Sequence, residues 1–188
     1  MSALFTPTRT KISVERFNKM VEAGVLTKYD RVELIEGEMI DMAPIGSLHA
    51  HAVTELSMLL ARAVSGEVRV TNQTPLVLSD LSEPQPDLML LRPRPGGYRD
   101  ALPRAEDVLL LIEVSDATLA FDRGTKLPLY AKRGVAETWI VDLQGRRLEI
   151  YSDPGATGYA KKRTLGPGDV AVPAALPGLK VDWGKIFA

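Results

Sequence analysis

Apolar residues recur at helical spacing in some segments and in alternating or continuous runs in others, which predicts a mixture of helices and strands. Helical spacing covers three segments: residues 14–24, 48–66 and 124–132. Strand patterns cover nine more: residues 31–42 (two strands around a tight turn at 36–37), 67–71, 74–79, 88–91, 107–114, 137–143, 146–153 and the turn-rich C-terminal pieces 159–165 and 169–173. Ser13 and Ser47 stand where helix caps are expected, and Pro128 is expected in the first turn of its helix.

Two of the apolar runs carry an acid near one end. Glu113 lies between Ile112 and Val114 in a run that suits a central strand covered on both faces. Asp87 leads directly into the apolar run 88–91. A buried carboxylate costs free energy unless it is paired, so both acids are expected to have a partner. The plainer alternatives are a buried salt bridge for Glu113 and a turn residue before a strand for Asp87.

The order of elements from residue 47 to residue 142 predicts an α/β fold with a central mixed β-sheet flanked by helices. The hairpins at either end, at 31–42 and 137–153, are expected to extend the sheet. A length of 188 residues suits a single domain, taken here as 1–188 with its core at about 47–142.

Composition narrows the class of protein only slightly. No apolar run approaches the ~18 residues of a membrane span, and the first 13 residues lack the pattern of a signal peptide. With no cysteine, disulfides and thiolate metal sites are excluded, so we expect a cytoplasmic protein without a membrane partner. Lys and Arg (23) balance Asp and Glu (24), so binding to nucleic acid would need locally concentrated positive charge or a bound cation.

If the strands of Asp87 and Glu113 are neighbours with their acids together, the two carboxylates repel each other unless a cation lies between them. Mg²⁺ (or Mn²⁺) suits hard oxygen ligands, and it can polarise a phosphodiester and activate a water. Glycosidases also use paired carboxylates, but an aromatic content of 6% does not favour a sugar cleft. Metal-assisted phosphoryl chemistry is therefore the preferred hypothesis.

A protein cation would complete such a site. Lys126 follows Glu113 on the next predicted helix, whose first turn can fold back towards the strand end. An ammonium there would orient the attacking water or stabilise charge on the scissile phosphate. Arg123 and Lys132 lie in the same segment, so spacing alone does not single out Lys126, and a solvated lysine is the plain alternative.

The fragments Pro86-Asp87, Glu113-Val114-Ser115 and residues 121–142 (FDRGTKLPLYAKRGVAETWIVD) together resemble the Uma-type restriction endonuclease family of the PD-(D/E)xK nuclease superfamily. The resemblance extends over roughly residues 12–152 and rests mainly on the third fragment. It implies a restriction-endonuclease-like fold and Mg²⁺-dependent phosphodiester cleavage. Asp87, Glu113 and the backbone carbonyl of Val114 would bind the metal. The superfamily places a lysine where this chain has Ser115, and the resemblance implies that Lys126 takes its role.

Other residues have weaker claims to the site. His49, at the start of the second predicted helix, matches a position where the family often has histidine and is expected near the acids. Ser115 is expected to cap a turn or helix rather than act as a nucleophile. Glu33 and Glu36 flank the first hairpin as surface or turn residues, and one of them, taken as Glu36, is an accessory candidate.

The segment 92–106 is rich in arginine, proline and glycine and is expected to be an exposed loop. Its arginines and tyrosine suit contacts to a nucleic-acid backbone, and the resemblance to a restriction-type family implies DNA. The candidates are Arg92, Arg94, Tyr98, Arg99 and Arg104. A homodimer would suit cleavage of both strands of a duplex. The rival hypotheses are a catalytically inactive nuclease-like module that binds nucleic acid, and an enzyme acting on a small phosphate ester.

Overall fold

Strand pairing in the computed structural model, which describes residues 9–27, 29–64, 66 and 68–187, builds one six-stranded sheet and a separate two-stranded sheet. The strands of the large sheet, in order across it, are β3 (Arg69–Asn72), β4 (Leu88–Leu91), β5 (Val108–Ser115), β6 (Glu137–Asp142), β7 (Arg147–Gly155) and β8 (Gly158–Leu165). Strands β5 and β6 are parallel, and the other neighbouring pairs are antiparallel. The mixed α/β sheet predicted from the sequence is confirmed.

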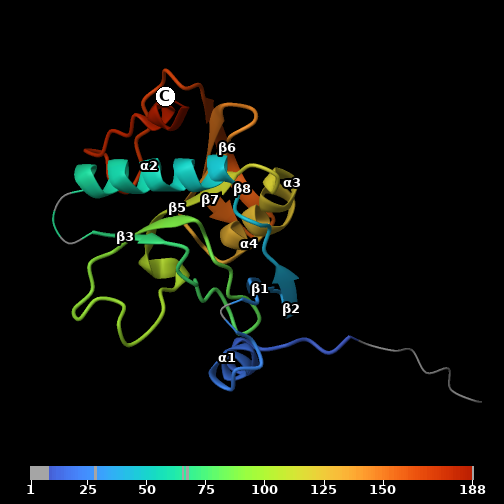
Figure 1. The fold of residues 1–188 in the computed structure, drawn as a ribbon. Helices are drawn as coiled ribbons and strands as arrows, with labels where there is room; N and C mark the ends of the chain where they lie inside the picture. The colour runs from blue at the N-terminus through green and yellow to red at the C-terminus, as the bar shows by residue number, and fades with distance from the viewer. Residues whose placement is uncertain (1–8, 28, 65, 67, 188) are drawn as a thin grey trace, which may run out of the picture.

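Helices cover both faces of this sheet (Figure 1). Helix α2 (Ser47–Ala63) packs on one face, and a continuous helical run packs on the other. That run consists of α3 (Leu119–Phe121), a π-helical turn η2 (Asp122–Lys126) and α4 (Leu127–Lys132). Alternation along β4 shows the layering, because Leu88 and Leu90 belong to the core beneath α2 whereas Met89 and Leu91 belong to the opposite core.

Strand β5 is buried along its whole length, as its apolar sequence predicts. Ile112 and Val114 face α2, and Leu111 faces the helical run. Glu113 therefore points to the same side as Leu111, towards the side chains of Tyr130 and Lys126.

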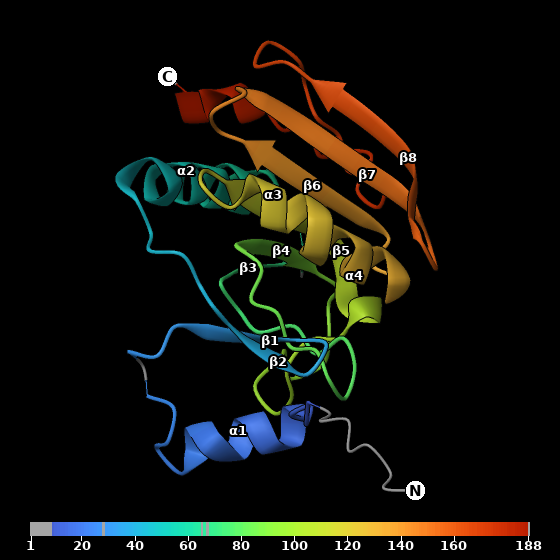
Figure 2. The same ribbon diagram turned by 90° about the vertical axis from the view of Figure 1, so that its right-hand side faces the viewer.

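The N-terminal hairpin joins β1 (Val32–Ile35) to β2 (Glu38–Asp41) through Glu36 and Gly37, both with positive φ angles, as a tight two-residue hairpin turn requires. The expectation that this hairpin extends the large sheet is wrong. Leu34 instead exchanges backbone hydrogen bonds with Glu83, in the segment that precedes β4. Figure 2 shows the hairpin and α1 (Val14–Glu22) beneath β3 to β5, far from β8.

Three further expectations need correction. Residues 74–79 form no strand, because the amides of Leu76 and Leu78 donate to carbonyls at residues 84 and 82 and the segment folds back on itself. Residues 169–173 contribute a single bridge, Ala171 to Val181, rather than a strand. The third helical segment begins at residue 119 instead of 124, although Pro128 does lie in the first turn of α4.

The C-terminal 3₁₀ helix (Trp183–Phe187) closes the core beneath α2 through Trp183 and Ile186. Within the described ranges, none of the helices combines the length and the apolar character needed to cross a lipid bilayer. The prediction about a signal peptide concerns mainly residues 1–8, which lie outside those ranges.

Candidate active site

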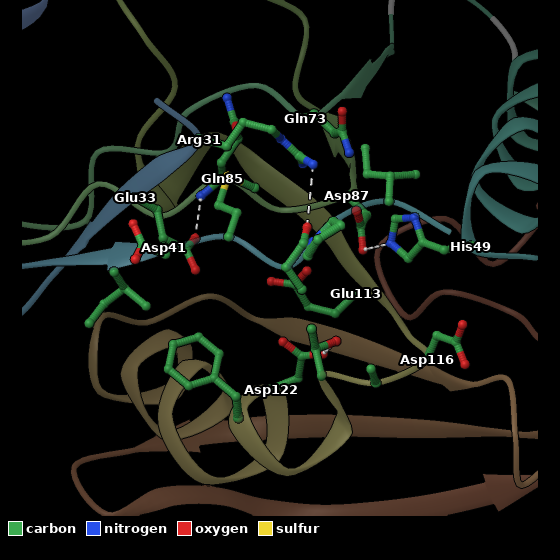
Figure 3. Close-up of a pocket in the computed structure, with 18 of the residues that line it drawn as sticks. Arg31, Glu33, Asp41, His49, Gln73, Gln85, Asp87, Glu113, Asp116 and Asp122 are labelled. Atoms are coloured by element: carbon green, nitrogen blue, oxygen red, sulfur yellow. Dashed lines mark hydrogen bonds and ion pairs between the residues drawn. The ribbon is translucent and has the colours of Figure 1, made fainter. Parts of the chain in front are cut away.

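A pocket of about 380 Å³ lies where the ends of β4 and β5 meet the helical run and the N-terminal hairpin (Figure 3). Its charged and imidazole side chains come from all of these elements and from the first turn of α2: Arg31, Glu33, Asp41, His49, Asp87, Glu113, Asp116, Asp122 and Lys126. The register of β4 and β5 explains the meeting point, because Leu88 pairs with Ile112 and so brings their acidic neighbours together.

Asp87 is held at the start of β4 by two donors. The backbone amide of Val114 donates to its Oδ2 atom at 2.9 Å, and the His49 Nε2 atom lies 3.1 Å from the same oxygen. The hydrogen bond to Asp87 raises the pKa of His49, against the opposing effect of burial. The structure thus brings His49 to the acid pair, and its contact is with Asp87.

Glu113 is 3% exposed and has two partners on the helical run. Its Oε1 atom lies 3.0 Å from Lys126 Nζ and also accepts a hydrogen bond from the Tyr130 hydroxyl. Burial raises the pKa of Glu113 to about 8; Lys126 opposes this rise, while Asp122 and Asp87 add to it. The acid in the apolar strand is therefore a paired group, as expected, but in this structure its partner is a lysine.

Lys126 ends the π-helical turn, in which the amide of Leu127 donates to the carbonyl of Asp122. The wide turn carries both Asp122 and Lys126 into the pocket. Lys126 also pairs with Glu33 at 3.2 Å. Burial alone would lower the pKa of Lys126, but Glu113 and Glu33 together raise it, so this side chain is an ammonium rather than a base.

Two acids of the pocket go beyond the sequence prediction: Asp122 was assigned no role, and Glu33 was named only as the alternative to Glu36. Glu33 was expected at the surface but is 4% exposed, and its Oε2 atom accepts a hydrogen bond from the backbone amide of Gln85 as well as pairing with Lys126. The accessory role expected for Glu36 is wrong. Glu36 lies in the hairpin turn and pairs with Lys132 and Arg133, outside the pocket.

Ser115 occupies the position where the superfamily has a lysine, and it is fully buried. Its hydroxyl donates to Asp122 Oδ2 at 2.7 Å, and the Thr118 hydroxyl donates to the same atom at 2.6 Å. Burial raises the pKa of Asp122 in spite of these two hydrogen bonds. Ser115 therefore positions a carboxylate. It was expected to cap a turn or helix, but it ends β5 and bonds the side chain of Asp122 instead.

The pocket is strongly acidic. Among the described residues, six carboxylates line it against two permanent cations, Arg31 and Lys126. A nucleic-acid phosphate would be repelled by this balance unless a divalent cation entered with it.

The donor set fits one Mg²⁺ ion held mainly by water. Asp87 and Glu113 each use one carboxylate oxygen in the hydrogen bonds above, so Asp87 Oδ1 and Glu113 Oε2 accept none from any described residue. Within the described part of the chain, no three His, Asp or Glu side chains are gathered as a ready-made metal cluster. Mg²⁺ commonly binds in this way, to one or two carboxylates together with water and substrate phosphate.

The arginine-rich loop forms a second hollow of about 670 Å³, lined by Arg69, Arg94, Tyr98 and Arg99 together with prolines and glycines of residues 93–97. The Arg94 guanidinium lies 5.3 Å from the centre of the Tyr98 ring. Arg99, in contrast, is paired with Asp100. Because Arg69 pairs with Leu91, the hollow lies at the end of β4 opposite to Asp87, roughly 13 Å away along the strand.

Arg92 and Arg104 lie at the ends of this loop and help to fix its path. The Nε atom of Arg92 donates to the carbonyl of Glu106, and its own carbonyl accepts from the Tyr98 hydroxyl. The amide of Arg104 donates to Asp107. The loop is exposed, as expected, but its backbone is held by these bonds.

The protein has a mixed sheet flanked by helices, two acids at the ends of neighbouring strands and a lysine in the same pocket. These features define a restriction-endonuclease-like α/β protein. The chain belongs to the Uma2 family, whose description is "Putative restriction endonuclease" and whose model matches residues 14–184. This membership supports a nuclease function.

A solved structure from Anabaena variabilis ATCC 29413, described as "a putative nuclease belonging to DUF820", has the same fold. It aligns with a TM-score of 0.72 at 17% identity and covers 94% of this chain and 97% of its own. The chain matches no curated protein.

Proposed function

We propose that this protein is a Mg²⁺-dependent endonuclease that cleaves phosphodiester bonds in DNA. The observation that carries the proposal is the pair of buried carboxylates on neighbouring strands, Asp87 and Glu113, beside the buried ammonium of Lys126. Family membership supports the reaction class, and the excess of carboxylates in the pocket supports the need for a cation.

Asp87, Glu113 and the carbonyl oxygen of Val114 would hold the metal, which would polarise the phosphodiester and lower the pKa of a bound water. His49 keeps the Asp87 carboxylate in place, since it contacts the oxygen that also accepts the Val114 amide. Lys126 carries a positive charge at the strand ends. It would stabilise the charge that develops on the scissile phosphate, and its raised pKa argues against a role as general base.

The hollow around Arg94 supports a backbone contact away from the cleavage site. Arg69 and Arg94 form no ion pair with any described residue, so their charges are available to a phosphate. The distance from Asp87 to the hollow, roughly 13 Å along β4, equals the length of a few nucleotides at ~3.4 Å per step. We therefore propose that the bound DNA strand runs from the acidic pocket across β3 and β4 to this hollow.

The test is divalent-dependent cleavage by the wild type compared with Asp87→Asn and with Asp116→Asn as a matched control. Both acids line the pocket, but Asp116 accepts its hydrogen bond from Gln144 and is not assigned to the metal. Mg²⁺- or Mn²⁺-dependent cleavage should disappear in Asp87→Asn and persist in Asp116→Asn. Cleavage by folded Asp87→Asn at the wild-type rate would refute the site.

One observation favours a second function, an inactive nuclease-like module that binds nucleic acid. Lys126 already neutralises Glu113, and Ser115 replaces the lysine of the superfamily pattern. Binding of nucleic acid that does not depend on a divalent cation, without cleavage of any substrate, would select this function.

A further inference from the structure

The wall of the pocket away from the paired acids is apolar. It is built by the side chains of Ile40, Met42 and Ile45, on β2 and the segment that follows it, and by Phe121 on the helical run. None of the four is fully buried, and Ile45 is 44% exposed, so they present apolar surface to whatever enters the pocket. Metal-assisted cleavage of a phosphate does not by itself require this surface.

Three polar side chains in the same pocket have unused hydrogen-bonding capacity. The side-chain amide groups of Gln73 and Gln85 form no hydrogen bond with any described residue. The Arg31 guanidinium donates one bond, to the carbonyl of Ala43 at 3.3 Å, and pairs with no described acid. Figure 3 shows Arg31, Gln73 and Gln85 on one side of the pocket, with Glu113 between them and Asp122.

Apolar surface combined with a few free polar groups is typical of a pocket for a small planar ligand. Amide and guanidinium groups bind the edges of nucleobases through paired hydrogen bonds, and aromatic rings stack on base faces. The volume of about 380 Å³ lies in the range of ~300–1,000 Å³ usual for small-molecule pockets, which is room for a base but not for a duplex.

We propose that the pocket receives one unstacked nucleobase beside the scissile phosphate, and that the substrate is single-stranded or locally unpaired DNA. This inference rests on the proposed function and specifies its substrate class. The base packs against Phe121 and Ile40, while Gln73, Gln85 and Arg31 bind its edge. A base inside a duplex cannot reach such a pocket without leaving the stack.

The test measures binding rather than cleavage, with fluorescently labelled oligonucleotides and Ca²⁺ in place of Mg²⁺. The wild type should bind a short single strand more tightly than the duplex of the same sequence. Phe121→Ala should weaken binding of the single strand by roughly 5- to 150-fold, the effect of losing one aromatic–base stack. Phe121→Tyr keeps the ring and should restore most of the binding.

A double-mutant cycle pairs the change at Phe121 with a change in the DNA. The DNA change is a set of single strands, each lacking the base of one nucleotide at a different position. At one position the missing base should weaken binding to the wild type but cause little further loss with Phe121→Ala. If Phe121→Ala does not fold, Gln85→Ala gives the same cycle, because the side-chain amide of Gln85 bonds no described residue and its removal breaks no contact within that part of the protein. Additive losses at every position, or equal affinity for duplex and single strand, would overturn the proposal. Cleavage of duplex at the single-strand rate would also overturn it, but would leave the nuclease assignment intact.

Discussion

Replacing Glu113 with glutamine separates a metal ligand from a structural ion pair, because the two roles predict opposite changes in stability. Burial raises the pKa of Glu113 from 4.5 to about 8, so the folded protein favours the protonated acid. The stability that this proton contributes is fully present below pH 4.5 and is lost as the pH rises towards 8. At pH 7 the loss amounts to roughly 3 kcal/mol, taking about 1.4 kcal/mol per pH unit.

Glutamine has the shape of the protonated acid but cannot ionise, so Glu113→Gln should not lose stability over this pH range. In EDTA at pH 7 the variant should melt above the wild type, by at most about 6–12 °C at ~2–4 °C per kcal/mol. That figure is an upper limit, because Lys126 then keeps Glu33 as its only ion-pair partner. The variant should also lose the rise in melting temperature that Mg²⁺ gives the wild type.

The assay is a set of thermal melts at pH 5, 7 and 9, in EDTA and in excess Mg²⁺, followed by metal titrations. Metal must displace the Glu113 proton, so the affinity of the wild type should rise about tenfold per pH unit and level off above about pH 8. Glu137→Gln is the control. Glu137 is also 3% exposed, but it accepts hydrogen bonds from Trp139 and Ala174 instead of contacting pocket residues. This variant should keep the wild-type response to Mg²⁺.

The contrary result is equally specific. If Glu113 is a structural partner of Lys126, its loss breaks a buried ion pair and should cost about 3–5 kcal/mol. A folded Glu113→Gln protein that melts below the wild type at pH 7 and 9, and still responds to Mg²⁺, would refute the metal site.

Two further predictions follow from the same geometry. Lys126→Gln should reduce the cleavage rate on the order of 10²–10³-fold at saturating Mg²⁺, because it removes the ammonium that lies 3.0 Å from Glu113; a rate equal to that of the wild type would exclude Lys126 from the mechanism. Arg94→Ala should weaken binding to DNA of any sequence and reduce the slope of log affinity against log salt by about 1. Arg163→Ala, an equally exposed change on β8 at the opposite edge of the sheet, should change neither, and identical losses in the two variants would argue against the hollow as a contact site.

The parts of the site on strands could be anticipated from the sequence. A carboxylate inside a continuous apolar run must be paired, and the period of two along β5 decides which face it points to. These two arguments need only local pattern, which explains why they succeed. That the strands of Asp87 and Glu113 are neighbours was an assumption, because the long loop 92–106 separates them in sequence; the pairing of Leu88 with Ile112 shows that they are.

The contributions of Glu33 and Asp122 could not be anticipated in this way. The local sequence around Glu33 predicts an exposed hairpin. In the fold this hairpin packs over the pocket, and the packing depends on the backbone pairing of Leu34 with Glu83. Asp122 lies before the glycine at which the helix was expected to begin. The one local signal was the polar series Ser115, Thr118 and Asp122, whose hydroxyls and carboxylate bond one another in the fold.

The π-helical turn makes the site depend on the length of the chain as well as on the identity of its residues. It holds one more residue between Asp122 and Leu127 than an α-helical turn would. Losing a single exposed residue such as Thr125 would let the turn rewind as an ordinary α-helical turn, in which the flanking segments keep nearly the same orientation. Every residue assigned to the site would survive such a deletion, but Asp122 and Lys126 would then be three residues apart instead of four, so the distance between carboxylate and ammonium along the pocket wall would change. A sequence comparison that counts only substitutions would therefore class a homologue with this deletion as having an intact site.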